Sequence, residues 1–234
     1  MNPRPGLAAL LALVFVTAST TRADAPATQP AAKPPAGAIV LFDGTNLDKW
    51  QHRDGSPLKW VLTGDGAAEV KGGDAVTKDT FGDFTLHLEF WLPKAPDDVK
   101  GQGRGNSGVY LLGVYEIQIL DSWGVEKLKP GDVGGIYQQK PADVNASTPP
   151  ETWQTYDITF RAPRFDGAGN RTEKARVSVV HNGQPIHTDV ELNGTTPSGI
   201  SDKESATGPI LLQDHGNPVR YRNIWIVPTT ETNH

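Results

Sequence analysis

Hydrophobic and polar residues alternate with a period of two along most of the chain. In residues 83–92 every second position from Phe84 to Leu92 is apolar, and the positions between, from Thr85 to Trp91, are polar or aromatic. This pattern predicts an antiparallel strand with one buried face and one polar face. Similar runs predict further strands at 107–112, 114–120, 152–161, 175–181, 186–192, 209–213 and 219–227.

Turn signals separate these runs, and no stretch of ten residues carries a helical stripe. Asn182-Gly183 lies between two of the runs and predicts a tight hairpin, because both residues tolerate positive φ. The glycine-rich segment 101–105 is followed by no Lys-Ser/Thr pair, so it predicts a hairpin loop and not a phosphate-binding loop. Many short strands at close spacing indicate an all-β fold, an antiparallel two-sheet jelly-roll sandwich.

The first residues have the layout of an export signal. Arg4 precedes an apolar run over residues 7–16, and residues 21–23 end in alanine. This predicts a signal peptide over 1–23, too short for a transmembrane anchor, and export to the periplasm or the cell exterior. Residues 24–37 are rich in alanine and proline and predict a flexible linker. We therefore expect one folded domain over 38–234.

Composition narrows the possible functions. The chain has no cysteine, which excludes disulfides, thiolate metal sites and cysteine nucleophiles. The formal net charge is −5, and removing the signal peptide takes away Arg4 and Arg22 and no acid, giving −7. An acidic chain is poorly suited to binding nucleic acid, which requires clustered lysine and arginine. The six histidines are scattered, so no spacing names a metal site, and a divalent metal ion stays an open possibility.

The segment 114–120 carries the first candidate chemistry. Ile117 and Ile119 face the core by alternation, so Glu116 and Gln118 share the accessible face. Asp121 falls on the other face unless a bulge adds one residue, which would place it beside Glu116. Two carboxyls on one sheet face can cleave a glycosidic bond. The alternative is a polar sheet surface with Asp121 beginning a turn.

Aromatic and amide side chains point to the same class of ligand. Sugar rings have apolar faces and hydroxylated rims, and aromatic residues beside short polar ones bind them. Candidates for such a surface are Glu89, Trp91, Tyr110, Tyr115, Trp123, Tyr137 and Trp153. Gln213, Asp214 and His215 end a predicted strand, and Asp214 either orients the His215 imidazole for proton transfer or bonds to its own backbone in a turn.

With these residues in view, the sequence resembles the secreted 3-keto-disaccharide hydrolases, which share the concanavalin A-like lectin and glucanase fold. The resemblance spans 38–234. It rests on ordered blocks at 41–44, 82–84, 88–90, 105–109, 115–121, 153–157, 181–183, 208–216 and 219–224. It implies a jelly roll and a sugar substrate already oxidised at C3.

The resemblance also implies a mechanism. A C3 ketone acidifies the C2 hydrogen, so a base can remove it and the C1 substituent departs by β-elimination, after which water adds. We expect Glu116 and His215 to supply the base and the acid. Asn106, Gln118, Gln213 and Tyr137 would hold hydroxyls and the ketone oxygen, with Arg104 stabilising an enolate. The Glu-x-Gln-x-x-Asp pattern also resembles the Glu-x-Asp-x-x-Glu strand of laminarinase-type hydrolases, with Gln118 and Asp121 replacing two acids.

Two other functions fit the same residues. A non-catalytic, lectin-like sugar-binding module would use the aromatic and amide groups without any proton transfer. A glycosidase acting on unoxidised glucans would use a carboxyl pair such as Glu116 and Asp121. The expected partner in each case is a carbohydrate.

Overall fold

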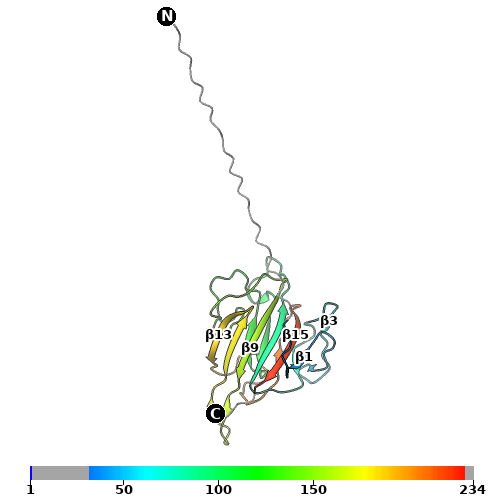
Figure 1. Cartoon of the computed structure of the whole chain (residues 1–234), viewed down its shortest axis with the longest axis vertical. Helices are drawn as coiled ribbons and strands as arrows, with labels where there is room; N and C mark the ends of the chain where they lie inside the picture. The colour runs from blue at the N-terminus through cyan, green and yellow to red at the C-terminus, as the bar shows by residue number, and fades with distance from the viewer. Residues whose placement is uncertain (2–31, 230–234) are drawn as a thin grey trace.

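Two antiparallel sheets form the protein, as the alternation predicted. The computed structural model describes residue 1 and residues 32–229. The larger sheet runs in the order β13, β12, β9, β6, β15, β4, β3, and β1 also pairs with β15. Figure 1 shows β13, β9 and β15 side by side across it. Its strands are β1 (Ile39–Phe42), β3 (Val61–Thr63), β4 (Ala67–Glu69), β6 (Phe84–Trp91), β9 (Trp153–Arg161), β12 (Arg176–His181), β13 (Gln184–Glu191) and β15 (Arg220–Pro228).

The smaller sheet has five strands in the order β2, β5, β14, β7, β8. They are β2 (Trp50–Gln51), β5 (Ala75–Thr77), β7 (Ser107–Leu111), β8 (Tyr115–Ile119) and β14 (Leu211–Leu212). A separate hairpin joins β10 (Arg164–Phe165) to β11 (Arg171–Glu173). Each predicted strand is present within a few residues of its expected bounds. The sequence did not predict β1 to β5, because strands of two to four residues are too short to show alternation.

The core lies between the two sheets. Phe84, Leu86 and Leu88 from β6 are fully buried, and they belong to the same cluster as Ile117 and Ile119 from β8. Burial of the alternate apolar residues on facing strands is the main stabilising contribution in such a sandwich. The predicted two-sheet antiparallel fold is therefore confirmed.

One of the two predicted hairpin turns is present and the other is not. Asn182 and Gly183 have φ of 50° and 79°, as a two-residue hairpin turn between β12 and β13 requires. The predicted hairpin loop at 101–105 is instead a single 3-10 turn, η1 (Gly101–Gly103), in the connection from β6 to β7. The hairpin prediction was therefore correct at Asn182 and wrong at the glycine-rich segment.

The predicted signal peptide over 1–23 lies outside the described residues, apart from Met1. The described part of the predicted linker, 32–37, is exposed and contains neither helix nor strand. No helix within the described chain is long and apolar enough to cross a bilayer. Folded structure begins at β1, close to the domain start expected at residue 38.

Candidate functional site

Glu116 and Gln118 lie on the outer face of the smaller sheet, as alternation along β8 predicted. The neighbouring strand β7 places Tyr110 opposite Glu116 and Gly108 opposite Gln118. Since the partner of Gln118 is a glycine, the Glu116 side chain can lie over the backbone there. A Cβ atom on Gly108 would come within 2.2 Å of Glu116 Oε1. The register of two strands therefore makes the space for this carboxyl group.

A narrow cleft of about 70 Å³ opens over this face. It brings together seven residues that the sequence proposed from four separate segments: Asn106, Tyr110, Glu116, Gln118, Tyr137, Gln213 and His215. Gln102 and Ser198 complete the lining. Within the described chain, the Tyr137 hydroxyl and the His215 imidazole make no hydrogen bond, so both groups are available to a ligand.

Glu116 is the ionisable group at the bottom of the cleft. Its side chain is buried, and its Oε2 accepts a hydrogen bond of 2.9 Å from the Tyr110 hydroxyl. Burial raises the pKa of Glu116 to about 7, although the Tyr110 bond lowers it in part; the nearby charge of Asp74 adds to the rise. The carboxyl group can therefore both take up and release a proton near neutral pH.

The Gln118 amide lies beside the Glu116 carboxyl group. Its Nε2 donates to Glu116 Oε1 at 2.8 Å and to the Ser107 backbone oxygen at 3.2 Å. This bond orients the carboxyl group in the cleft.

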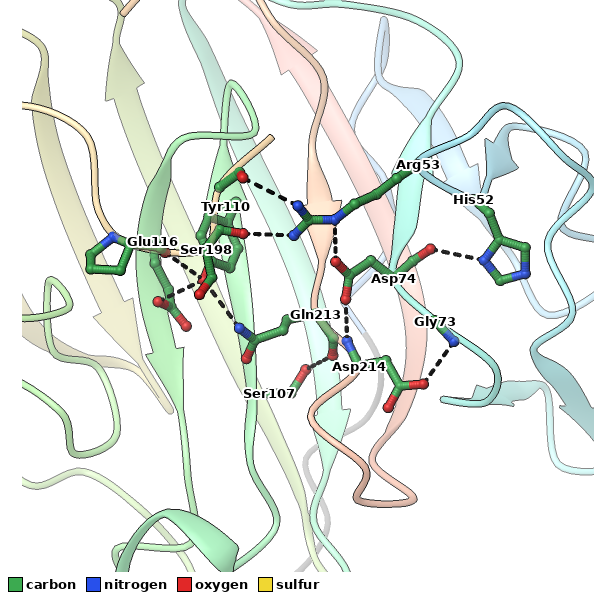
Figure 2. A network of polar contacts seen from close by, with 12 residues as sticks. His52, Arg53, Gly73, Asp74, Ser107, Tyr110, Glu116, Ser198, Gln213 and Asp214 are labelled. Carbon is green, nitrogen blue, oxygen red and sulfur yellow. Dashed lines mark hydrogen bonds and ion pairs between the residues drawn. The ribbon is translucent and has the colours of Figure 1, made fainter. Parts of the chain in front are cut away.

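A network of polar contacts holds the segments around the cleft together (Figure 2). Arg53 forms an ion pair with Asp74 and also donates to the backbone oxygens of Ser198, at 2.6 Å, and Gly199, at 3.1 Å. Asp74 in turn accepts the backbone N–H of Asp214 at 2.7 Å. Gln213, next to Asp214, donates to the Tyr110 hydroxyl at 3.1 Å. These contacts link the loop at 198–199 and the turn after β14 to the smaller sheet.

Asp121 and Arg104 do not line the cleft, contrary to the prediction. The pairing of β8 with β7 is regular, so no bulge turns Asp121 toward Glu116. The Asp121 carboxylate is buried and forms an ion pair of 2.5 Å with Arg104, and it also accepts the backbone N–H of Trp123. The two residues neutralise each other at the end of β8, so neither is placed to act on a ligand in the cleft.

Glu89 and Trp91 lie on the opposite side of the molecule, so their assignment to the site was wrong. They alternate with the core residues of β6 and therefore occupy the outer face of the larger sheet. Burial alone would raise the pKa of Glu89, but bonds from His87, Asn223 and Arg222 hold it at about 2. The Trp91 ring is covered by Arg220, whose guanidinium carbon lies 4.7 Å from the ring centre.

Most of the other aromatic candidates are also away from the cleft. Tyr115 faces the core, and Trp153 lies under the Arg222 guanidinium on the larger sheet, 4.0 Å from it. Trp123 is exposed and is not among the cleft residues. Only Tyr110 and Tyr137 belong to the cleft. Aromatic content alone did not identify the site, because an aromatic residue suits a sheet surface on either side.

Asp214 forms the turn that was one of its two predicted roles. Its Oδ1 accepts the backbone N–H of Gly216 at 2.8 Å and its Oδ2 accepts that of Gly73 at 2.8 Å. Both oxygens are thus used by the backbone, and Asp214 does not orient the His215 imidazole. His215 is exposed at the mouth of the cleft.

Sequence reasoning missed Gln102, Ser198, Arg53 and Asp74. Gln102 lies in the glycine-rich segment that was interpreted only as a loop, and its amide contacts Asn106 and Gln118. Ser198 and Arg53 are separated by 145 residues and belong to no alternating run. No local pattern marks such residues, since only the tertiary fold brings them to the cleft.

The residues present do not outline a metal site. Among the described side chains, no group of three or more His, Asp or Glu residues is gathered as a metal ion would require. The cleft itself offers one carboxyl group, one imidazole, amides and hydroxyls. We therefore derive no step through a metal ion.

Comparison with known proteins identifies the family. Residues 37–227 match the 3-keto-alpha-glucoside-1,2-lyase-like domain. A 3-keto-disaccharide hydrolase of Bacteroides thetaiotaomicron is 25% identical over 239 aligned residues, which cover 80% of this chain and 77% of that protein.

Solved structures show the same fold. A candidate glycosyl hydrolase from Parabacteroides distasonis is 37% identical with a TM-score of 0.75, covering 83% of this chain and 85% of that one. A second such protein from the same species is 20% identical with a TM-score of 0.63, covering 83% and 94%. With the match over 37–227, this chain belongs to the 3-keto-alpha-glucoside-1,2-lyase-like domain family.

Proposed function

We propose that this protein breaks the glycosidic bond of a sugar whose ring carries a ketone at C3, by β-elimination followed by addition of water. The observation that carries the proposal is Glu116: a buried carboxyl group at the bottom of a narrow polar cleft, with a pKa of about 7. The family and the Bacteroides relative support a carbohydrate-active enzyme of this kind.

The proposed first step is proton abstraction by Glu116. A ketone at C3 makes the C2 hydrogen acidic, and the ionised carboxylate takes this proton. The electrons of the C2–H bond form an enolate over C2, C3 and the ketone oxygen. When the enolate collapses, the C1–oxygen bond breaks and leaves a C1–C2 double bond. Water then adds, with its oxygen at C1 and a proton at C2.

His215 is the proposed acid for the departing oxygen. It lies at the mouth of the cleft, where a leaving group exits, and histidine ordinarily exchanges protons near neutral pH. Tyr137 and Gln213 line the same space and supply donors for the ketone oxygen and the ring hydroxyls. Asn106 donates its amide to Gln102 and so supports the cleft wall. The buried ion pair of Arg104 with Asp121 removes Arg104 from the enolate-stabilising role.

The geometry disfavours a conventional displacement. Such glycosidases need two carboxyl groups separated by about 5–9.5 Å across the scissile bond. Of the described residues that line the cleft, only Glu116 carries a carboxyl group. Elimination needs a single carboxylate base, which is what the cleft provides.

Turnover in heavy water tests the mechanism. The purified protein is incubated with a 3-keto-disaccharide and with the unoxidised disaccharide, with and without a chelator, and products are followed by mass spectrometry. We expect cleavage of the keto form only, with one deuterium at C2 of the product above an enzyme-free control. Cleavage without deuterium at C2 contradicts elimination. Binding without cleavage indicates a sugar-binding module, and cleavage of the unoxidised disaccharide indicates an ordinary glycosidase.

Two substitutions test the assigned residues. Glu116→Gln and His215→Asn are each expected to lower kcat/KM by about a hundredfold or more, a typical contribution of general acid–base catalysis. Glu191→Gln is the matched control, because this exposed carboxylate forms surface ion pairs only, with Lys174 and Arg176 on the larger sheet. Wild-type rates in both cleft variants would contradict the assignment.

A further inference from the structure

The hydroxyl group of Tyr110 lies within donor distance of two oxygen atoms. Tyr110 is on β7, directly opposite Glu116, and its side chain is fully buried. Its hydroxyl is 2.9 Å from Glu116 Oε2 and 3.1 Å from the Pro197 backbone oxygen. A phenol carries a single proton. Only one of these two oxygens can therefore receive a full hydrogen bond at any time.

The Gln213 amide does not compete for that proton. Its Nε2 atom lies 3.1 Å from the Tyr110 oxygen (Figure 2), and an amide nitrogen is only a donor. The Tyr110 oxygen therefore accepts from Gln213 in either orientation of its own proton. Burial, together with the nearby Glu116, raises the pKa of Tyr110 far above its ordinary value, so the phenol keeps this proton. The remaining freedom is rotation of the O–H bond between Glu116 and Pro197.

The charge of Glu116 decides which oxygen receives the proton. A hydrogen bond to an ionised carboxylate is about twice as strong as one between neutral groups, so Tyr110 donates to Glu116 while Glu116 is ionised. Glu116 Oε1 accepts from the Gln118 amide, so a proton on the carboxyl group belongs on Oε2. Oε2 is then a hydroxyl oxygen, which is a weaker acceptor than a peptide oxygen. The Tyr110 proton should therefore turn to Pro197.

Pro197 belongs to one wall of the cleft. The next residue, Ser198, lines the cleft, and the hydroxyl of the preceding Thr196 accepts the backbone N–H of Glu116 at 2.9 Å. This backbone contact does not depend on the charge of the Glu116 side chain. The bond from Tyr110 to Pro197 does depend on it, and it joins the wall to β7 when the carboxyl group carries a proton.

We propose that Tyr110 is a positioning residue whose hydroxyl proton alternates between Glu116 and Pro197 as Glu116 loses and gains the substrate proton. While Glu116 is ionised, Tyr110 holds Oε2 in position to take the C2 hydrogen. After that transfer the Tyr110 proton turns to Pro197 and fastens this wall of the cleft until the C1–oxygen bond breaks. The proton stays on the Tyr110 oxygen throughout, so only hydrogen bonds change there. This role rests on the proposed function, because it takes Glu116 as the base.

The pH dependence of the rate tests the contact with Glu116. Tyr110→Phe keeps the ring and removes a donor to the carboxylate, so the acidic limb of kcat/KM should shift to higher pH by at least about one unit. Tyr156→Phe is the matched control, because this buried tyrosine donates to the Gln118 backbone oxygen at 2.7 Å and not to the carboxyl group. Its acidic limb should stay at the wild-type pH. An unchanged limb in Tyr110→Phe would overturn the role.

Nuclear magnetic resonance tests the contact with Pro197. Pro197-Ser198 is the only proline–serine step in the chain, so carbon-13 in proline carbonyls combined with nitrogen-15 in serine reports on this one peptide bond. In the wild type we expect the Pro197 carbonyl resonance to move between pH 5.5 and 8 with a midpoint near 7, as Glu116 titrates. It should stay still in Glu116→Gln, which has no carboxyl group.

Tyr110→Phe separates rotation of the hydroxyl from the charge of Glu116 alone, because this variant keeps the charge. We expect its Pro197 resonance to stay still as well. A resonance that is still in the wild type, or that moves equally in Tyr110→Phe, would overturn the alternation while leaving the proposed function intact. No cleavage of any 3-keto compound by the wild type would overturn the proposed function, and the Pro197 resonance would still show whether Tyr110 responds to Glu116.

Discussion

At the scale of single residues, the reactive carboxyl group depends on a glycine. Gly108 lies on β7 beneath the Glu116 side chain, and it has no Cβ to occupy the space that the carboxylate fills. The block Asn106-Ser107-Gly108 thus has three separate roles. Asn106 contacts the Gln118 amide, Ser107 donates to the Gln213 backbone oxygen at 2.6 Å, and Gly108 makes room for Glu116.

Gly108→Ala should therefore impair activity more than stability. The added methyl would meet the end of a flexible side chain, which can move without unfolding the sheet. A displacement of the carboxylate by about 1 Å can cost roughly a hundredfold in rate. We expect kcat/KM to fall at least tenfold while the melting temperature changes little. Gly64→Ala, at a position with open space, is the control. A large loss of stability in Gly108→Ala alone would contradict this account.

The burial of Glu116 also makes the stability of the fold depend on pH. Its pKa rises from 4.5 to about 7 on folding, so ionisation disfavours the folded state. The stability is fully present below pH 4.5 and decreases as pH rises through about 7. Glu116→Gln should remove this loss and stabilise the protein at pH 8 relative to pH 4.5, by up to about 3 kcal/mol at roughly 1.4 kcal/mol per unit.

Urea unfolding of wild type and Glu116→Gln at pH 4.5, 6 and 8 measures this difference. Glu191→Gln controls for the loss of an exposed carboxylate. A stability difference that is the same at all three pH values would contradict the raised pKa of Glu116.

At the scale of elements, Arg53 joins the loops that form the walls of the cleft. Arg53 follows β2, contacts Asp74 just before β5, and holds the loop at 198–199 through two backbone oxygens. Asp74 lies close enough to Glu116 for its negative charge to raise the pKa there. The Arg53–Asp74 ion pair therefore fixes the loop at 198–199, which forms one wall of the cleft. It also limits how far the negative charge of Asp74 raises the pKa of Glu116.

Arg53→Gln should alter both the position of the loop at 198–199 and the pKa of Glu116. The loop at 198–199 loses two hydrogen bonds, and Asp74 loses its neutralising partner. We expect kcat/KM to fall about tenfold and its acidic limb to shift to higher pH, because unpaired Asp74 raises the pKa of Glu116 further. The limb is measured from pH–rate profiles.

Arg53→Lys should restore the acidic limb, since it keeps the charge, but only part of the rate, since lysine lacks the planar fork. Arg176→Gln is a matched control, because Arg176 also binds a carboxylate and a backbone oxygen, both of Asp189, on the larger sheet. An unchanged acidic limb in Arg53→Gln would show that Arg53 acts only on structure.

At the scale of the whole molecule, the two sheets have different outer faces. The smaller sheet carries the cleft. The larger sheet carries a buried charged cluster in which His87 bonds to Asp157 at 2.6 Å and Arg222 bonds to Glu89 at 2.7 Å. Burial alone would lower the pKa of His87, but Asp157 and Glu89 raise it to about 9. These charges neutralise one another, which accounts for the burial of His87 and Glu89 on this face.

We propose that the chain is exported and that its first 23 residues are removed. The reason is the short apolar run over residues 7–16 with a small residue at position 23. Expression of the whole chain in a bacterium, followed by fractionation and N-terminal sequencing, should give a protein that begins at Asp24 outside the cytoplasm. A chain that keeps residue 7 onwards in the cytoplasmic fraction would contradict this proposal.

Much of the fold was predictable, because alternation is a local property of each strand. The predicted strands and the Asn182-Gly183 hairpin follow from side-chain periodicity and from backbone freedom at two residues. The same periodicity correctly placed Glu116 and Gln118 on one face, away from the core, but not their burial there. It could not assign Glu89 to a sheet, since a strand of either sheet shows the same alternation. Alternation alone put Asp121 on the face away from Glu116, and its place in the site depended on a bulge that the regular pairing of β8 lacks. The Arg104 role came from the resemblance, and local pattern did not show its ion pair with Asp121.

The sequence by itself determined which side of each strand faces the core, and so which polar side chains point away from it. Only the tertiary structure decided that Asn106, Tyr137, Gln213 and His215 line one cleft with Glu116 and that Gly108 leaves room for the carboxyl group. The physical reason is that alternation orients a side chain relative to its own strand. The order of strands and the loops held by Arg53 decide what lies beside it.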